Sequence, residues 1–136
     1  MRTTLLPVLI ASISVLLISV AILYLGIFMF PSLMEEYYNA TFRSSSFDTD
    51  ILFYIHPFIL CAGLKLFWDK FKGEANQSAF SRAFTVALSY GGVAMLPVLW
   101  LTFSAIDISM MMVVTWLVYG VLQAFIATLV FAKMTP

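Results

Sequence analysis

The sequence contains few side chains that could do acid–base or metal chemistry. Its only histidine is His56, which precedes Pro57, and its only cysteine is Cys61. A histidine with a reference pKa of about 6.5 can relay protons or act as a general acid or base. Cys61 lies about 140° around a helix from His56, which does not favour a shared metal ion. We therefore expect no metal site and no cofactor, and His56 is either a titrating group or a neutral histidine near a membrane surface.

A second set of polar side chains, Thr115, Tyr119 and Gln123, recurs every four residues and would form a line along one helix face. Gln123 lies far from any charge, where an unpaired amide is costly, so we expect it to point into a helix bundle. The line could be one wall of a hydrated path. Alternatively, it makes hydrogen bonds between helices, worth about 0.6–2 kcal/mol each. The possible partners are Ser12, Ser14, Ser19, Thr85 and Ser89.

Large aromatic side chains accompany His56 in the half of the chain that we expect to face outward. They are Tyr24, Trp100 and Trp116, together with Tyr54. If the helices part on that side, these residues could line a pocket whose acidic mouth would suit a lipophilic or cationic small molecule. Alternatively, they form the aromatic belt that membrane proteins carry at the interface. The acidic residues of the mouth would be Glu35, Glu36, Asp50 and Asp107.

Composition indicates which elements position these residues. The chain has 136 residues, of which 62% are hydrophobic and 10% charged, and its mean hydropathy is +1.01. Soluble domains carry roughly 25% charged residues, so this composition predicts an integral membrane protein. Charge-free stretches long enough for helices of about 20 residues separate Arg2 from Glu35, Arg82 from Asp107, and Asp107 from Lys133. A shorter one follows Asp50, where Lys65 can snorkel and extend the helix.

We therefore predict an all-α fold, a single domain over 1–136 with four transmembrane helices in an up-down-up-down bundle. The spans are expected at 5–30, 51–68, 80–104 and 109–132, with an outer loop at 31–50. Lysine and arginine collect on the cytoplasmic side of membranes. Cytoplasmic N- and C-termini would leave only Arg43 outside and place inside Arg2, Lys65, Lys70, Lys72, Arg82 and Lys133. The short, loop-poor chain without a targeting segment suggests a bacterial inner membrane.

Small residues recur along three of the predicted spans and suit close helix contact. Two of these stripes have a spacing of four residues, and the third has a spacing of seven. Gly91-Gly92 and Pro97 also predict a kink in the third span. The stripes are Ala83, Ala87 and Gly91; Gly120, Ala124 and Thr128; and Ser12, Ser19 and Gly26.

Several function classes lack their signatures. The net charge is zero, which does not favour nucleic acid, and no HExxH, GxSxG or Walker motif occurs. We recognise no family. The leading expectation is a non-enzymatic accessory or scaffold subunit, or a homo-oligomer, whose small-residue stripes meet other helices within the bilayer or a larger membrane complex. The alternative is a small-molecule or proton pathway, or an outer binding pocket, that uses His56 and Gln123. A third is an enzyme acting on a lipid or quinone.

Overall fold

The computed structural model describes residues 2–71 and 77–135, which contain helices and no strands. The long stretches are α1 (Arg2–Met29), α3 (Phe47–Phe71), α4 (Ala79–Tyr90) continued through η2 (Gly91–Met95) into α5 (Leu96–Ala105), and α6 (Met110–Met134). Each of the four is long and apolar enough to cross a membrane. The four membrane-length helices expected from the charge-free stretches are thereby confirmed.

The segment between the first two spans is more structured than a loop. It contains α2 (Pro31–Glu35) and the short 3-10 helix η1 (Glu36–Tyr38). Moreover, α3 begins at Phe47, four residues earlier than expected, because Ser46 and Thr49 cap its start reciprocally. The Ser46 backbone N–H donates to Thr49 Oγ1 at 2.9 Å, and the Thr49 N–H donates to Ser46 Oγ at 3.4 Å. Asp48 and Asp50 in the first turn favour the same start.

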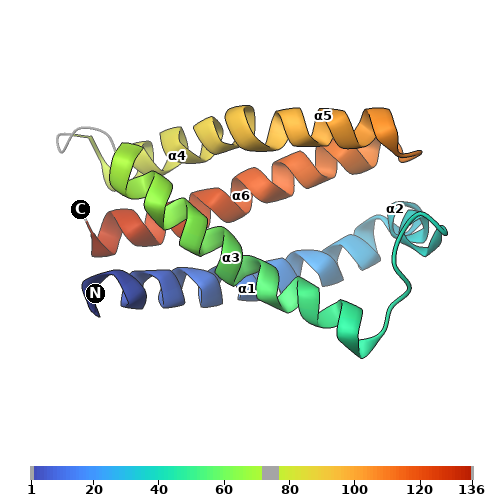
Figure 1. Cartoon of the computed structure of the whole chain (residues 1–136), viewed down its shortest axis with the longest axis horizontal. Helices are drawn as coiled ribbons and strands as arrows, with labels where there is room; N and C mark the ends of the chain where they lie inside the picture. Colours follow the sequence, from blue (N-terminus) through green and yellow to red (C-terminus); the bar gives the residue numbers. More distant parts are fainter. Residues whose placement is uncertain (1, 72–76, 136) are drawn as a thin grey trace.

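Consecutive long helices run in opposite directions, and both chain ends lie at the same end of the molecule (Figure 1). Helix α6 packs against α1, α3 and α4, and to a lesser extent α5, so it is the central element. Helix α3 crosses the others obliquely, and no extensive packing joins it to α5. The arrangement is therefore a bundle built around α6 that is less closed at the end away from the termini.

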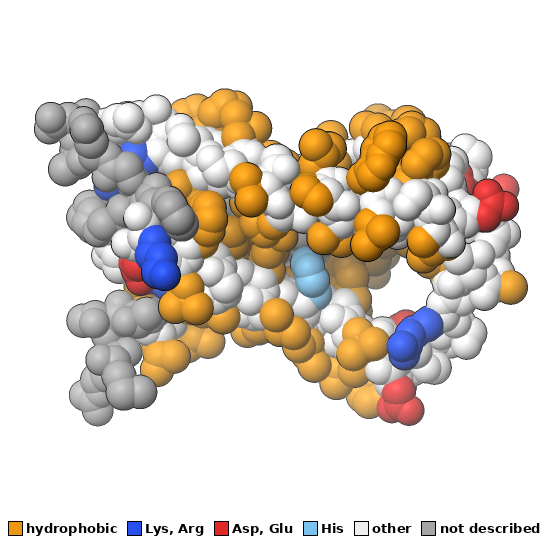
Figure 2. All heavy atoms as spheres, turned by 45° about the horizontal axis from the view of Figure 1, so that its top comes forward, with side chains coloured by type: hydrophobic (Ala, Val, Ile, Leu, Met, Phe, Trp, Pro, Cys, Tyr) orange, Lys and Arg blue, Asp and Glu red, His pale blue; other side chains and the backbone are white. Residues whose placement is uncertain are grey.

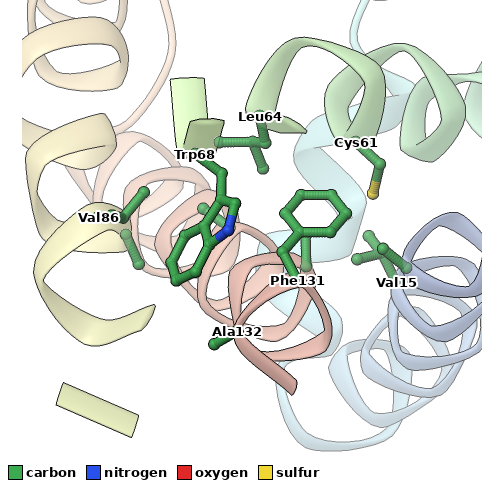
Figure 3. Packing of buried hydrophobic residues seen from close by; sticks show 11 residues of the cluster. Val15, Cys61, Leu64, Trp68, Val86, Phe131 and Ala132 are labelled. Atoms are coloured by element: carbon green, nitrogen blue, oxygen red, sulfur yellow. The ribbon is translucent and has the colours of Figure 1, made fainter. Parts of the chain in front are cut away.

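The main core lies toward the end that carries the termini. Val15 from α1, Trp68 from α3, Val86 from α4 and Phe131 from α6 are buried together, with Cys61 and Leu64 beside them (Figure 3). A smaller cluster of Leu33, Ile108 and Met112 lies at the opposite end. The helices are therefore packed more tightly at the end that carries the termini than at the opposite end.

The two four-residue stripes of small residues meet each other inside this chain. Ala83, Ala87 and Gly91 on α4 and η2 are buried, as are Gly120, Ala124 and Thr128 on α6. Thr128 Oγ1 donates a hydrogen bond to the carbonyl of Ala83 at 3.1 Å. The seam requires its glycines, because a Cβ on Gly91 would lie 2.5 Å from Val121 Cγ2. These stripes are therefore occupied within the chain rather than exposed for another one.

The interruption predicted in the third span takes the form of a π-helical segment at Gly91–Met95. Pro97, just beyond it, has no N–H, and its ring would crowd the carbonyl four residues earlier in a regular helix. A wider turn relieves that contact. The segment also brings Met95 against Gly120 of α6.

Candidate functional site

Gln123 and Ser19 form a buried polar pair between α6 and α1. Gln123 Nε2 donates to Ser19 Oγ at 2.9 Å, and Ser19 Oγ donates in turn to the carbonyl of Val15 at 2.7 Å. Both side chains are almost completely buried, so Gln123 points into the bundle as expected, with a partner from the predicted set. The hydroxyl of Tyr119 lies close to both residues. The polar line on α6 is therefore satisfied at its inner end by contact with α1.

Beyond this pair, α1 and α6 separate and leave a groove of ≈ 560 Å³. Its wall on α6 includes Thr115, Trp116 and Tyr119 from the sequence-predicted set, and Ser19 lies on its α1 side. The other lining residues are almost all apolar: Ile22, Leu23, Leu25 and Gly26 of α1, Phe30 between α1 and α2, Leu33 and Met34 of α2, Phe53 of α3, and Met111, Val114, Val118 and Leu122 of α6, with Tyr37. The lining contains no carboxylate, histidine or cysteine, so it offers shape and hydroxyl groups rather than acid–base chemistry.

A folded segment covers one end of the groove. We call residues 31–42 the outer cap, because the sequence predicts that this segment faces outward. Its Tyr37 accepts a hydrogen bond from Trp116 Nε1, and Phe42 packs edge-on against the Trp116 ring at 6.2 Å between centroids. Glu36 Oε2 accepts from the backbone N–H of Ser109 at 3.3 Å, at the start of α6, where a carboxylate is favoured by the helix dipole. These contacts hold the outer cap on α6.

The Tyr37 hydroxyl lies where it could meet a bound molecule, because Tyr37 lines the groove. Burial is the main reason that the pKa of Tyr37 is raised above its ordinary value; the neighbouring charge of Glu36 adds to the shift, and the hydrogen bond from Trp116 opposes it. The phenol therefore stays protonated at neutral pH. In that form it can accept from Trp116 and also donate to a ligand.

Three residues of the sequence-predicted set do not line the groove. Tyr24 and Trp100 are 69% and 68% exposed, on faces of α1 and α5 that turn away from the interior. His56 of α3 is also exposed. The single histidine is visible in pale blue near the middle of the surface in Figure 2. Of the sequence-predicted set, Trp116 and Tyr119 thus line the groove, Gln123 lies beside Ser19 and Tyr119, and His56, Tyr24 and Trp100 do not line the groove.

A second, more polar cavity of ≈ 930 Å³ adjoins the groove on the side of α3. It lies beneath the segment that joins the outer cap to α3, and sequence reasoning missed it. Arg43 and Asp50 supply its charges, and its hydroxyl and amide groups come from Tyr37, Tyr38, Asn39, Ser44, Ser45, Thr49 and Tyr54. The only signal in the sequence was a lone arginine within an acidic and serine-rich segment.

Basic residues gather at the opposite end of the molecule. Lys65 is buried, forms an ion pair with Asp69 and lies 5.8 Å from the centre of the Phe131 ring. Arg82 is also buried, and its guanidinium lies 5.6 Å from the Trp68 ring. These ring contacts and the ion pair offset part of the cost of burying the two cations, although Arg82 Nε is buried without a hydrogen-bond partner among the described residues.

Across the described parts of the chain, no group of three or more His, Cys, Asp and Glu side chains is placed to hold a metal ion. The groove and the polar cavity are two features that could hold another molecule. Comparison with known proteins adds no relative, because no protein-family model, curated protein or solved structure matches this chain.

Proposed function

We propose that this chain is an integral membrane protein that binds a lipophilic molecule in the groove between α1 and α6. One observation carries the proposal, namely a cavity of ≈ 560 Å³ whose walls are apolar except for a few hydroxyl groups and an indole. Ligand pockets typically have volumes of about 300–1,000 Å³ and combine apolar walls with a few polar groups that orient the ligand. Here those polar groups are Ser19, Thr115, Tyr119 and Tyr37.

We place the protein in a bacterial inner membrane with both termini in the cytoplasm. The distribution of lysine and arginine supports this orientation, because among the residues that the structure describes Arg43 is the only basic one on the side of the outer cap. The groove would then lie within the outer leaflet. Val118 and Leu25 on its wall are 62% and 55% exposed, so a lipophilic molecule could enter from the bilayer.

The groove favours binding over catalysis. Its lining has no group that titrates near neutral pH and no nucleophile other than hydroxyls without an adjacent base. An enzyme acting on a lipid or quinone would need such a group at the reacting atom. His56, the residue that could have served, does not line the groove.

An accessory or homo-oligomeric role is the second candidate, and it would need surfaces other than the α4–α6 seam. Gly63 on α3 and Gly92 on η2 favour it, because both are exposed and a Cβ at either position would meet no atom within 4 Å. Another helix could approach closely at these two points.

Native mass spectrometry of the full chain extracted with its own lipids tests the proposal. We compare the parent protein with Gly26→Leu, which fills the groove. The new Cβ would make only ordinary contact with Met34, at 3.6 Å, so the fold should tolerate it. Gly63→Leu is the matched control, since it makes the same change on a face with open space.

We expect a bound lipophilic mass on the parent protein and on Gly63→Leu, and its loss from Gly26→Leu. Equal retention by Gly26→Leu would contradict the proposal. A defined multiple of the chain mass that Gly63→Leu or Gly92→Leu disrupts would instead support the homo-oligomer.

A further inference from the structure

The groove and the polar cavity adjoin each other. Leu23, Met34, Tyr37 and Phe53 line both of them. The groove is apolar and lies between α1 and α6, whereas the cavity lies beneath the polar segment that precedes α3. A molecule that fills both parts must therefore be an amphiphile, with an apolar chain at one end and a polar head at the other.

The polar cavity carries one charge of each sign. Among the described residues the only ion pair is Lys65–Asp69, so the Arg43 guanidinium has no carboxylate partner. Guanidinium groups bind phosphate oxygens through two parallel N–H donors. Ser45 Oγ donates to the Asp50 carboxylate and lies 3.1 and 3.0 Å from its two oxygens. The negative charge of Asp50 can attract an ammonium group.

The charge around the cavity argues against a net-anionic head. The segment 31–50 contains Glu35, Glu36, Asp48 and Asp50 against Arg43 alone, so four negative charges and one positive charge sum to −3. Such a surface repels an anion and attracts a group that also carries a positive charge. Figure 2 shows basic and acidic side chains together at the rim of the hollow at this end of the molecule.

We infer that the ligand is a zwitterionic phospholipid or a similar amphiphile with a phosphate and an amine. Its phosphate is bound by Arg43, its ammonium group faces Asp50, and its acyl chain lies in the groove between α1 and α6. This inference rests on the proposed function, because it names the class of molecule that the same groove holds. Hydroxyl groups of Tyr38, Ser44 and Thr49 complete the cavity around the head group.

Competition between defined lipids tests the inference. The full-length protein is incubated in detergent with phosphatidylethanolamine, phosphatidylglycerol and diacylglycerol of identical acyl chains, and native mass spectrometry measures how much of each is retained. We expect phosphatidylethanolamine to be retained above phosphatidylglycerol. Arg43→Gln should lower its retention about tenfold, since it removes a charge-assisted contact, while diacylglycerol is unaffected.

Asp50→Asn should shift the preference toward phosphatidylglycerol, because it removes one repulsive charge and the partner of the amine. The matched control is Asp107→Asn, an outer acidic residue that does not line the cavity. Preference for phosphatidylglycerol by the parent protein, or an unchanged preference in both cavity variants, would overturn the head-group inference. If the parent protein binds all three lipids equally and Gly26→Leu abolishes this binding, the head-group inference is overturned but the groove proposal stands. Binding that Gly26→Leu does not reduce would overturn both.

Discussion

Gln123 and Ser19, 104 positions apart in the sequence, share a hydrogen bond of 2.9 Å in the apolar interior between α6 and α1. It lies where the tightly packed half of the molecule gives way to the groove, because Ser19 also lines the groove. A membrane-length helix buries an amide only where it finds a partner. The pair therefore fixes the rotation of α6 relative to α1, and with it the faces that line the groove.

Replacing Ser19, the acceptor, should lower the unfolding free energy more than replacing Gln123, the donor. Ser19→Ala leaves the Gln123 amide without its acceptor, so we expect a loss of about 1–2 kcal/mol in unfolding free energy. Gln123→Leu should be nearly neutral, since Ser19 keeps its bond to the carbonyl of Val15. Unfolding in mixed micelles with increasing denaturing detergent measures both. A neutral Ser19→Ala would show that the pair does not stabilise the bundle.

A methyl group at Gly120 would test the α4–α6 seam. A Cβ there would lie 2.0 Å from Met95 Sδ, so Met95 must move. Because the Met95 side chain is flexible and only partly buried, we expect Gly120→Ala to lower the unfolding free energy by no more than about 1 kcal/mol. The loss should couple to Met95→Ala in a double-mutant cycle.

Gly92→Ala is the control for this seam, because its Cβ meets nothing within 4 Å. The same detergent titration applies. Equal losses of unfolding free energy in Gly92→Ala and Gly120→Ala would mean that glycine is needed at position 120 for backbone flexibility rather than for close packing.

At neutral pH and above, docking of the outer cap should not change until the phenol of Tyr37 ionises. The pKa of Tyr37 is raised by burial, so the folded protein holds this proton more tightly than the unfolded chain. Its contribution to stability is complete below pH of about 10, the unfolded value, and falls as pH rises through the raised folded value. Tyr37→Phe should remove that part of the alkaline loss.

Fluorescence of Trp116 reports this docking, since its indole donates to Tyr37. The other two tryptophans are replaced by phenylalanine for the measurement. Tyr38→Phe is a suitable control, because Tyr38 is exposed. Loss of docking between pH 6 and 8 in the parent protein would contradict the role assigned to Tyr37.

The proposed orientation predicts which positions a membrane-impermeant maleimide reaches in intact cells. In a Cys61→Ser background, Ser45→Cys on the outer segment should be labelled. Lys70→Cys, at the end that carries the termini, should be labelled only after the membrane is opened. Labelling of Lys70→Cys in intact cells, with protection of Ser45→Cys, would reverse the orientation and place the groove in the inner leaflet.

The sequence by itself determined the helices. Charge-free stretches of membrane length leave the backbone no other way to satisfy its hydrogen bonds in lipid, so four spans follow from composition and spacing. It also indicated that Gln123 would point inward, because an isolated amide is costly in lipid. The stripes of small residues at Gly91 and Gly120 also indicated close packing, because only small residues let helices approach closely.

Only the tertiary structure decided which faces meet. Lipid is as apolar as a helix interface, so helices that are apolar all around carry little sign of which side is buried. Trp116 and Trp100 look alike in sequence, yet Trp116 lies on the groove and Trp100 faces outward. The same ambiguity hid the pairing of the α4 and α6 stripes within one chain. The polar cavity that Arg43 lines depends on a non-periodic segment whose path is set by contacts such as Tyr37 with Trp116, which no local pattern encodes.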